Sequence, residues 1–161
     1  EEAVAALAVA HSRDDIAEAL LRYGRGAFDW VVLFLVRDGM ALGWRGRGAG
    51  LDPTMVELIM LPLNAPSMFQ EAADGRTVFT GAVSETVLHR HFYKALRREL
   101  PHQAAVVPVV MKDRAVNLIY GDRADGADVS AAAQALAELA GHVAAAYERI
   151  VRESKRRLEG R

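Results

Sequence analysis

A strand, a tight turn and a returning strand form the pattern that most constrains the fold of this chain. Residues 30–36 are a β-branched and aromatic run that is bounded by turn residues and too short for a core helix, which predicts a buried strand. Asp38-Gly39 then favours a type I′ hairpin turn. In residues 40–45, larger apolar side chains alternate with small or polar ones, as in a half-buried strand that pairs with the first.

A second hairpin is predicted in the last third of the chain. Residues 105–111 and 115–120 are apolar runs joined by a polar turn at 112–114. Pro108 indicates an edge position or a bulge in the first of these strands. Because hairpins join antiparallel strands, the expected class is α+β and not a doubly wound parallel fold.

Helices and two short strands complete the predicted order. Ser12 begins a helix that ends at Gly24 and Gly26, and Ser67, Ser84 and Ser130 also stand at helix starts, where capping accounts for a serine. The further segments are expected as a helix in 3–10, a helical turn from Asp52-Pro53, helices in 66–73, 84–100 and 130–158, and strands in 58–61 and 77–80.

The amino-acid composition excludes several classes of function but says less about the fold. The chain of 161 residues carries 20 Lys and Arg against 21 Asp and Glu, which argues against a general nucleic-acid binder. It contains no cysteine, so thiol catalysis and Cys-ligated metals are excluded. Alanine accounts for 29 residues and is concentrated in 3–10 and 131–146, which predicts closely packed helices.

No linker or repeat divides the chain, so we expect one domain over residues 1–161, with a helical lead-in at 1–12 and a long helix at 130–158. The missing initiator Met and the helical sequence at both ends predict a segment excised from a longer protein. No run approaches the roughly 18 apolar residues of a membrane span, and no signal peptide is recognisable, so we expect a cytoplasmic protein without membrane insertion.

The last third of the chain resembles a GAF domain. The resemblance lies in the hairpin Val106-Val-Pro-Val-Val-Met-Lys-Asp-Arg-Ala-Val-Asn-Leu-Ile-Tyr120 and the following helix Leu136-Ala-Glu-Leu-Ala-Gly-His-Val-Ala-Ala-Ala-Tyr147. It implies a central antiparallel sheet of about six strands, with the N- and C-terminal helices packed on one face and a pocket on the other. The chain is also similar in pattern to GAF-like modules of bacterial signalling and motility proteins.

Departures from the family pattern limit what the resemblance implies. The Asn-Lys-Phe-Asp-Glu set of cyclic-nucleotide-binding members is not recognisable. The bilin-linking and methionine-sulfoxide-reductase members need cysteines, which this chain lacks. Asn117 stands where the family commonly has Gly. We therefore expect no cofactor.

The glycine-rich stretch 43–50 and the pair His89 and His91 invite chemical interpretations. The stretch predicts a flexible loop at a strand end, with an anion or partner contact through Arg45 and Arg47 as the alternative. A dinucleotide site would need a parallel βαβ unit, which the preceding hairpin denies. On a helix, residues i and i+2 point about 200° apart, so the two histidines cannot share a metal ion, and we expect no metal site.

The candidate ligand pocket combines aromatic and polar side chains from the variable middle of the chain. Aromatic walls with a few polar groups suit a planar ligand, whereas the alternative is an ordinary filled core. The candidates are Trp44, Arg45, Ser67, Phe69, Phe79, His91 and Phe92. No serine or carboxylate is backed by a positioned histidine, so no catalytic residue is assigned and no enzyme activity is expected.

The long C-terminal helix suggests a partner surface. An apolar stripe at heptad spacing predicts a homodimer through the terminal helices. Its members are Leu136, Leu139, Val143, Ala146 and Ile150. We therefore expect a non-catalytic sensory and dimerisation module that binds a small molecule or a protein partner and transmits the signal through its terminal helices. The alternative is a ligand-free scaffold whose loops at 46–50 and 124–128 bind a protein.

Overall fold

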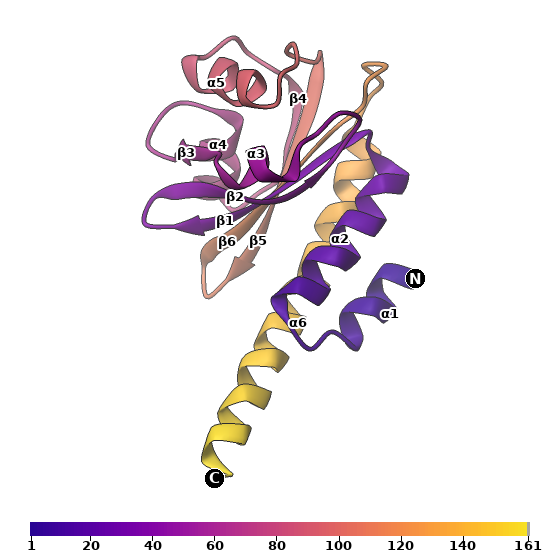
Figure 1. The fold of residues 1–161 in the computed structure, drawn as a ribbon, viewed down its shortest axis with the longest axis vertical. Helices are drawn as coiled ribbons and strands as arrows, with labels where there is room; N and C mark the ends of the chain where they lie inside the picture. Colours follow the sequence, from indigo (N-terminus) through magenta and orange to yellow (C-terminus); the bar gives the residue numbers. More distant parts are fainter. Residues whose placement is uncertain (161) are drawn as a thin grey trace.

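The computed structural model describes residues 1–160, which form six helices and six strands. Figure 1 shows their arrangement. In chain order they are α1 (Glu2–Ala8), α2 (Arg13–Ala27), β1 (Trp30–Arg37), β2 (Met40–Arg47), α3 (Pro53–Glu57), β3 (Met60–Pro62), α4 (Met68–Gly75), β4 (Phe79–Ala82), α5 (Val87–Ala95), β5 (Gln103–Met111), β6 (Arg114–Asp122) and α6 (Ser130–Glu159). The predicted α+β class is confirmed.

The six strands form one sheet in the order β3-β2-β1-β6-β5-β4, and every neighbouring pair is antiparallel. Both predicted hairpins are confirmed. Asp38 and Gly39 have φ of 50° and 73°, and Lys112 and Asp113 have φ of 50° and 62°, so each turn places two residues in the left-handed region that a type I′ turn requires. The second turn thus has two residues, and Arg114 already belongs to β6.

Pro108 lies where the sheet can tolerate a missing N–H donor. Strand β4 pairs with β5 only as far as Val106, and the β5 to β6 register shifts between Val109 and Val110. Pro108 therefore has β6 as its only strand neighbour and lies next to a bulge, so both predicted features are present.

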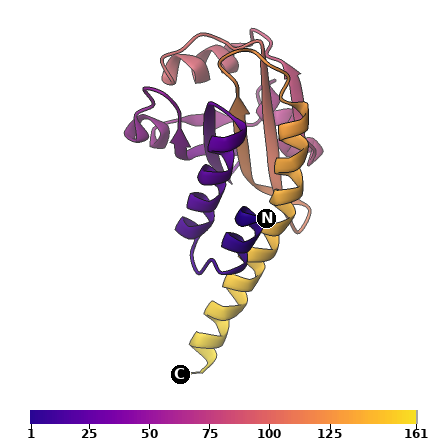
Figure 2. The same cartoon turned by 90° about the vertical axis from the view of Figure 1, so that its right-hand side faces the viewer.

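Two separate apolar cores cover the two faces of the sheet. On one face, α2 and the first half of α6 pack against the strands, and α1 packs on both helices (Figures 1 and 2). On the other face, α3, α4 and α5 enclose the second core. The two alanine-rich segments belong to α1 and α6, which are in contact, as their small side chains predicted.

Helix α2 is longer than the sequence suggested, because it continues through Gly24 to Ala27. A Cβ atom at Gly24 would lie 2.6 Å from Val31 Cγ2, so this glycine permits close packing of the helix on β1 and does not end the helix. Ser12 caps α2 as predicted, with its hydroxyl accepting the Asp15 N–H.

The start of α5 also differs from the prediction. The capping residue is Thr86, whose hydroxyl accepts the His89 N–H, and not Ser84. Val87, the first residue of α5, is 82% exposed. Ser67 caps α4 as expected, whereas the first free N–H of α6, that of Ser130, is accepted by Asp128. The short strands β3 and β4 each begin two residues later than predicted.

The glycine-rich stretch is mostly strand, because β2 extends to Arg47. A Cβ atom at Gly43 would lie 1.8 Å from the backbone oxygen of Val56, so α3 can sit against β2 only if this position has no side chain. The prediction of a loop over the whole of residues 43–50 is wrong. Gly43 is a strand residue, and the close approach of the α3 backbone explains why it has no side chain.

We expect Gly43→Ala to lower the free energy of unfolding by at least about 2 kcal/mol, because α3 must move away from β2. Gly141→Ala is the matched control. Gly141 lies in α6 with open space around it, so alanine there should raise stability by up to about 1 kcal/mol. Urea unfolding followed by circular dichroism measures both, and equal stability of the two variants would contradict the packing argument.

Candidate functional site

The predicted pocket face of the sheet is filled by aromatic rings. Phe69 packs edge-on against Phe34 and Phe92, with ring centroids 5.3 and 5.1 Å apart. Phe92 in turn contacts Tyr93 and Tyr120, each at 4.9 Å. All five side chains are fully buried. Edge-to-face contacts at these distances are the favourable geometry for aromatic pairs, so this group, the aromatic cluster, is a packed core.

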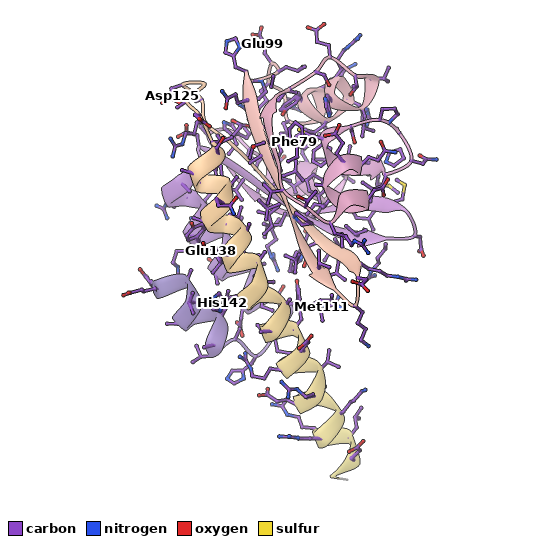
Figure 3. The ribbon with its side chains drawn as sticks, turned by 180° about the vertical axis from the view of Figure 1, so that it is seen from behind. Phe79, Glu99, Met111, Asp125, Glu138 and His142 are labelled. Atoms are coloured by element: carbon purple, nitrogen blue, oxygen red, sulfur yellow. The ribbon has the colours of Figure 1, made fainter. Side chains whose placement is uncertain are left out.

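Only part of the predicted pocket set lies at this cluster. Phe69 and Phe92 are members, and Phe79, on the edge strand β4, is partly buried against the same core (Figure 3). Ser67 is buried but engaged as the cap of α4. Phe69 and Phe92 therefore pack directly against each other and do not line an open space.

The other three candidates lie elsewhere. Trp44 packs with the core formed by α1, α2 and α6, because it alternates in β2 with Ala41 and Gly43, which face the other core. Arg45 forms an ion pair with Asp14 at the start of α2. His91 is exposed on α5. Trp44 is the extra residue at the irregularity between β1 and β2, which places Arg45 on the same side as Trp44, so the alternation seen in the sequence holds only as far as Trp44.

His89, which the sequence flagged beside His91, is a buried structural residue. Its Nδ1 lies 2.8 Å from the Ser84 carbonyl oxygen, and its Nε2 accepts the Met68 N–H at 2.9 Å. The ring therefore joins the start of α5 to the first turn of α4, with both nitrogens occupied. No group of three metal-ligating side chains is found among residues 1–160.

A buried polar chain that sequence reasoning missed runs beside the aromatic cluster. The Tyr93 and Tyr120 hydroxyls are 2.7 Å apart, and Tyr120 donates to Asp122. Asp122 is fully buried and receives two hydrogen bonds from the Arg98 guanidinium, at 2.5 and 2.9 Å. The guanidinium also lies 4.4 Å from the Trp30 ring centroid, a cation–π contact.

Every member of this polar chain has a hydrogen-bond partner. Burial raises the pKa of Tyr120 well above its usual value, and burial likewise raises the pKa of Tyr93, so both phenols stay protonated. Burial opposes the charge of Arg98, but the hydrogen bonds and charge of Asp122 more than offset this and raise its pKa. Among the described residues, no buried side-chain polar atom lacks a partner. These groups hold the loop after α5 on the sheet.

A second polar link ties α6 to the centre of the sheet. The Tyr147 hydroxyl donates to Asn117 Oδ1 at 2.7 Å, and Asn117 Nδ2 donates to the Phe34 carbonyl oxygen at 3.0 Å. Burial raises the pKa of Tyr147 to about 12, against the opposing effects of the nearby Arg13 charge and of the bond to Asn117. Asn117 therefore anchors a helix to the sheet.

The predicted dimer stripe is used inside the monomer. Leu136, Leu139, Val143 and Ala146 are buried against the sheet, α1 and α2, and only Ile150 is partly exposed. The outward side of this part of α6 carries polar and small residues, with Glu138 and His142 among the exposed ones (Figure 3). Heptad spacing alone cannot distinguish an intramolecular helix face from an intermolecular one.

The sequence matches no family model and no curated protein. Solved structures are similar in fold. The GAF domain of a phosphoenolpyruvate-protein phosphotransferase from Coxiella burnetii is 14% identical, with a TM-score of 0.75 over 99% of this chain and 92% of that chain.

Two further structures have the same fold. The GAF domain of a two-component sensor histidine kinase from Bacillus halodurans is 21% identical, with a TM-score of 0.68 over 90% of this chain and 99% of that chain. A free methionine-R-sulfoxide reductase from Neisseria meningitidis is 16% identical, with a TM-score of 0.69 over 95% and 87% of the two chains. The chain therefore has a GAF-like fold, as the sequence resemblance implied.

We expect Phe92→Ala to lower the free energy of unfolding by about 3–5 kcal/mol, because it empties a space at the centre of the aromatic cluster. His91→Ala, one residue earlier and exposed, should change it by less than about 0.5 kcal/mol. Urea unfolding of both variants provides the comparison. A cost below about 1 kcal/mol for Phe92→Ala would indicate a ring that lines a space.

Alkaline pH should destabilise the protein through its tyrosines. An unfolded tyrosine ionises near pH 10, whereas folded Tyr147 remains protonated until about pH 12, so its contribution is complete below pH 10 and lost between pH 10 and 12. The slope contributed by each such group is about 1.4 kcal/mol per pH unit. Urea unfolding at pH 8, 10 and 11 tests this, and Tyr147→Phe should show a shallower decline; the same slope in both proteins would contradict the assignment.

Proposed function

We propose that this chain is a non-catalytic regulatory module of a bacterial signalling protein, that it acts in the cytoplasm as a homodimer, and that its output is a change in the position of α6. The GAF-like fold supports the proposal, because two of the similar structures come from a phosphotransferase and a sensor histidine kinase. The reductase shares the fold, but this sequence has no cysteine for thiol chemistry. No helix within residues 1–160 is long and apolar enough to cross a membrane.

The course of α6 is the observation on which the proposal rests. Its first half is part of the domain core, and Tyr147 is its last hydrogen-bonded anchor to the sheet. Beyond this point the helix projects away from the sheet (Figures 1 and 2). Val151 and Leu158 are 51% and 72% exposed, and their spacing of seven residues puts both on one side of the helix. A helix held rigidly at one end and free at the other can transmit a small rotation.

The dimer contact is therefore proposed for the projecting part of α6 and not for the buried stripe. Leu158→Glu should convert a dimer to a monomer while leaving the thermal unfolding of the domain nearly unchanged, because Leu158 contacts no core. Leu139→Arg should instead unfold the domain, since this leucine is buried in the monomer. Light scattering at high micromolar concentration measures the mass, and a monomeric wild-type protein would overturn the dimer.

The alternative function is an interaction scaffold without a small ligand on the aromatic face. The tightly packed aromatic cluster favours it, because no space is left among the rings that a sensor would need. In that case the exposed segments 49–50 and 124–125 of the predicted contact loops would meet a protein partner. Native mass spectrometry of freshly purified protein separates the two functions, since a retained small molecule supports sensing and its absence favours the scaffold.

A further inference from the structure

A half-open groove lies on the face of the sheet that α2 and α6 cover, at the end where α6 leaves the sheet. It has a volume of about 290 Å³, near the lower limit of small-molecule sites. Its walls are apolar and come from three elements: Leu35 of β1, Met111 and Val116 of the β5 to β6 hairpin, and Ile150 and Val151 of α6. Figure 3 shows Met111 at the lower end of the hairpin, beside α6. We call this space the α6 groove.

The charges at the α6 groove are of one sign. Arg13 and Arg37 line it and are exposed, and neither forms an ion pair within residues 1–160. The carboxylates next to Arg13 in sequence are engaged elsewhere, since Asp14 pairs with Arg45 and Asp15 accepts the His11 N–H. The groove therefore offers two unneutralised cations beside its apolar walls.

A neighbouring groove on the opposite side of the hairpins provides a contrast. It is wider, at about 940 Å³, and its lining mixes Arg37 and Arg114 with Asp38 and Asp74. Such a surface does not select the sign of a ligand. The α6 groove does, because its lining contains no acidic residue.

The polar floor of the α6 groove is Asn117 with the Tyr147 hydroxyl, and these two groups bind each other. Arg13 lies close enough for its charge to act on the Tyr147 phenol. A ligand in the groove would thus contact the residue that anchors α6 to the sheet and the two residues, Ile150 and Val151, where the helix begins to project.

We infer that the α6 groove binds a small amphipathic anion, a carboxylate with an acyl or aryl tail, whose tail packs between the hairpin and α6 and whose carboxylate is held by Arg13 and Arg37. Guanidinium groups form charge-assisted hydrogen bonds with carboxylates, and a tail of this kind buries the exposed apolar wall. The groove lies on the opposite side of the sheet from the aromatic cluster. Only the signalling consequence, a shift of α6, rests on the proposed function; the binding does not.

Octanoate is a suitable probe, and octylammonium is its matched control, because the two have straight alkyl tails of similar length and head groups of opposite charge. Calorimetric titration of the whole chain should show octanoate binding at least tenfold tighter than octylammonium. The double variant Arg13→Gln/Arg37→Gln should lose at least tenfold in octanoate affinity, whereas Arg152→Gln, on exposed α6 outside the groove, should retain it. Equal binding of the two probes, or an unchanged double variant, would overturn the inference.

A second comparison tests the location without removing charge. Val151→Trp should fill the α6 groove and abolish octanoate binding, while Val87→Trp, at an exposed position of α5 on the other face, should not. Amide shift changes on octanoate addition should fall on β1, the β5 to β6 hairpin and α6; changes on α3 to α5 would overturn the site.

A second copy of the chain is the competing occupant of the α6 groove. If Val151→Trp dissociated a dimer that octanoate left intact, the groove would belong to the dimer interface and the inference would fail. The dimer itself is judged by Leu158→Glu, outside the groove, so a failure to bind octanoate would leave the proposed function standing. A monomeric wild type that binds octanoate would overturn only the dimer.

Discussion

The central strands of the sheet are buried on both faces, and this constraint determines where every helix must lie. Strands β1, β5 and β6 supply residues to both cores, so each face needs its own apolar cover. Burial of an apolar side chain is worth about 1.5–3 kcal/mol, which makes an uncovered face untenable. The cover on one face consists of α1, α2 and α6, which carry many small residues. The cover on the other face consists of α3, α4 and α5 and is built around aromatic rings.

The two covers differ in what they leave free. The aromatic cover is closed, with five interlocked rings and a satisfied polar chain that ends in the Arg98 and Asp122 ion pair. The cover made by α1, α2 and α6 is closed only as far as Tyr147. Beyond this residue α6 leaves the sheet, and the α6 groove opens between the helix and the strands. The space that a ligand could occupy therefore lies on the face covered by α1, α2 and α6. It lies at the point where α6 stops packing on the sheet and begins to project.

Much of the fold could be predicted from local patterns. Asp38-Gly39 specifies a hairpin because only a few residue types tolerate positive φ at both turn positions, and Ser12 and Ser67 begin helices because their hydroxyls accept free N–H groups. Less of the candidate site could be predicted. The sequence predicted one helix over residues 84–100, but α5 ends at Ala95, and a residue at positive φ, Arg97, turns Arg98 inward to Asp122.

By itself the sequence determined the antiparallel hairpins, the starts of α2 and α4 at Ser12 and Ser67, and the lack of any cysteine thiol, since each depends on residue type or on neighbours within a few positions. Only the tertiary structure decided that Trp44 packs on the face covered by α1, α2 and α6, and that Arg13 and Arg37 line one groove. It also decided that the stripe from Leu136 to Ala146 is buried within a single chain. Those outcomes depend on register and on contacts between distant segments. Local propensity does not encode which of two apolar faces a side chain will meet.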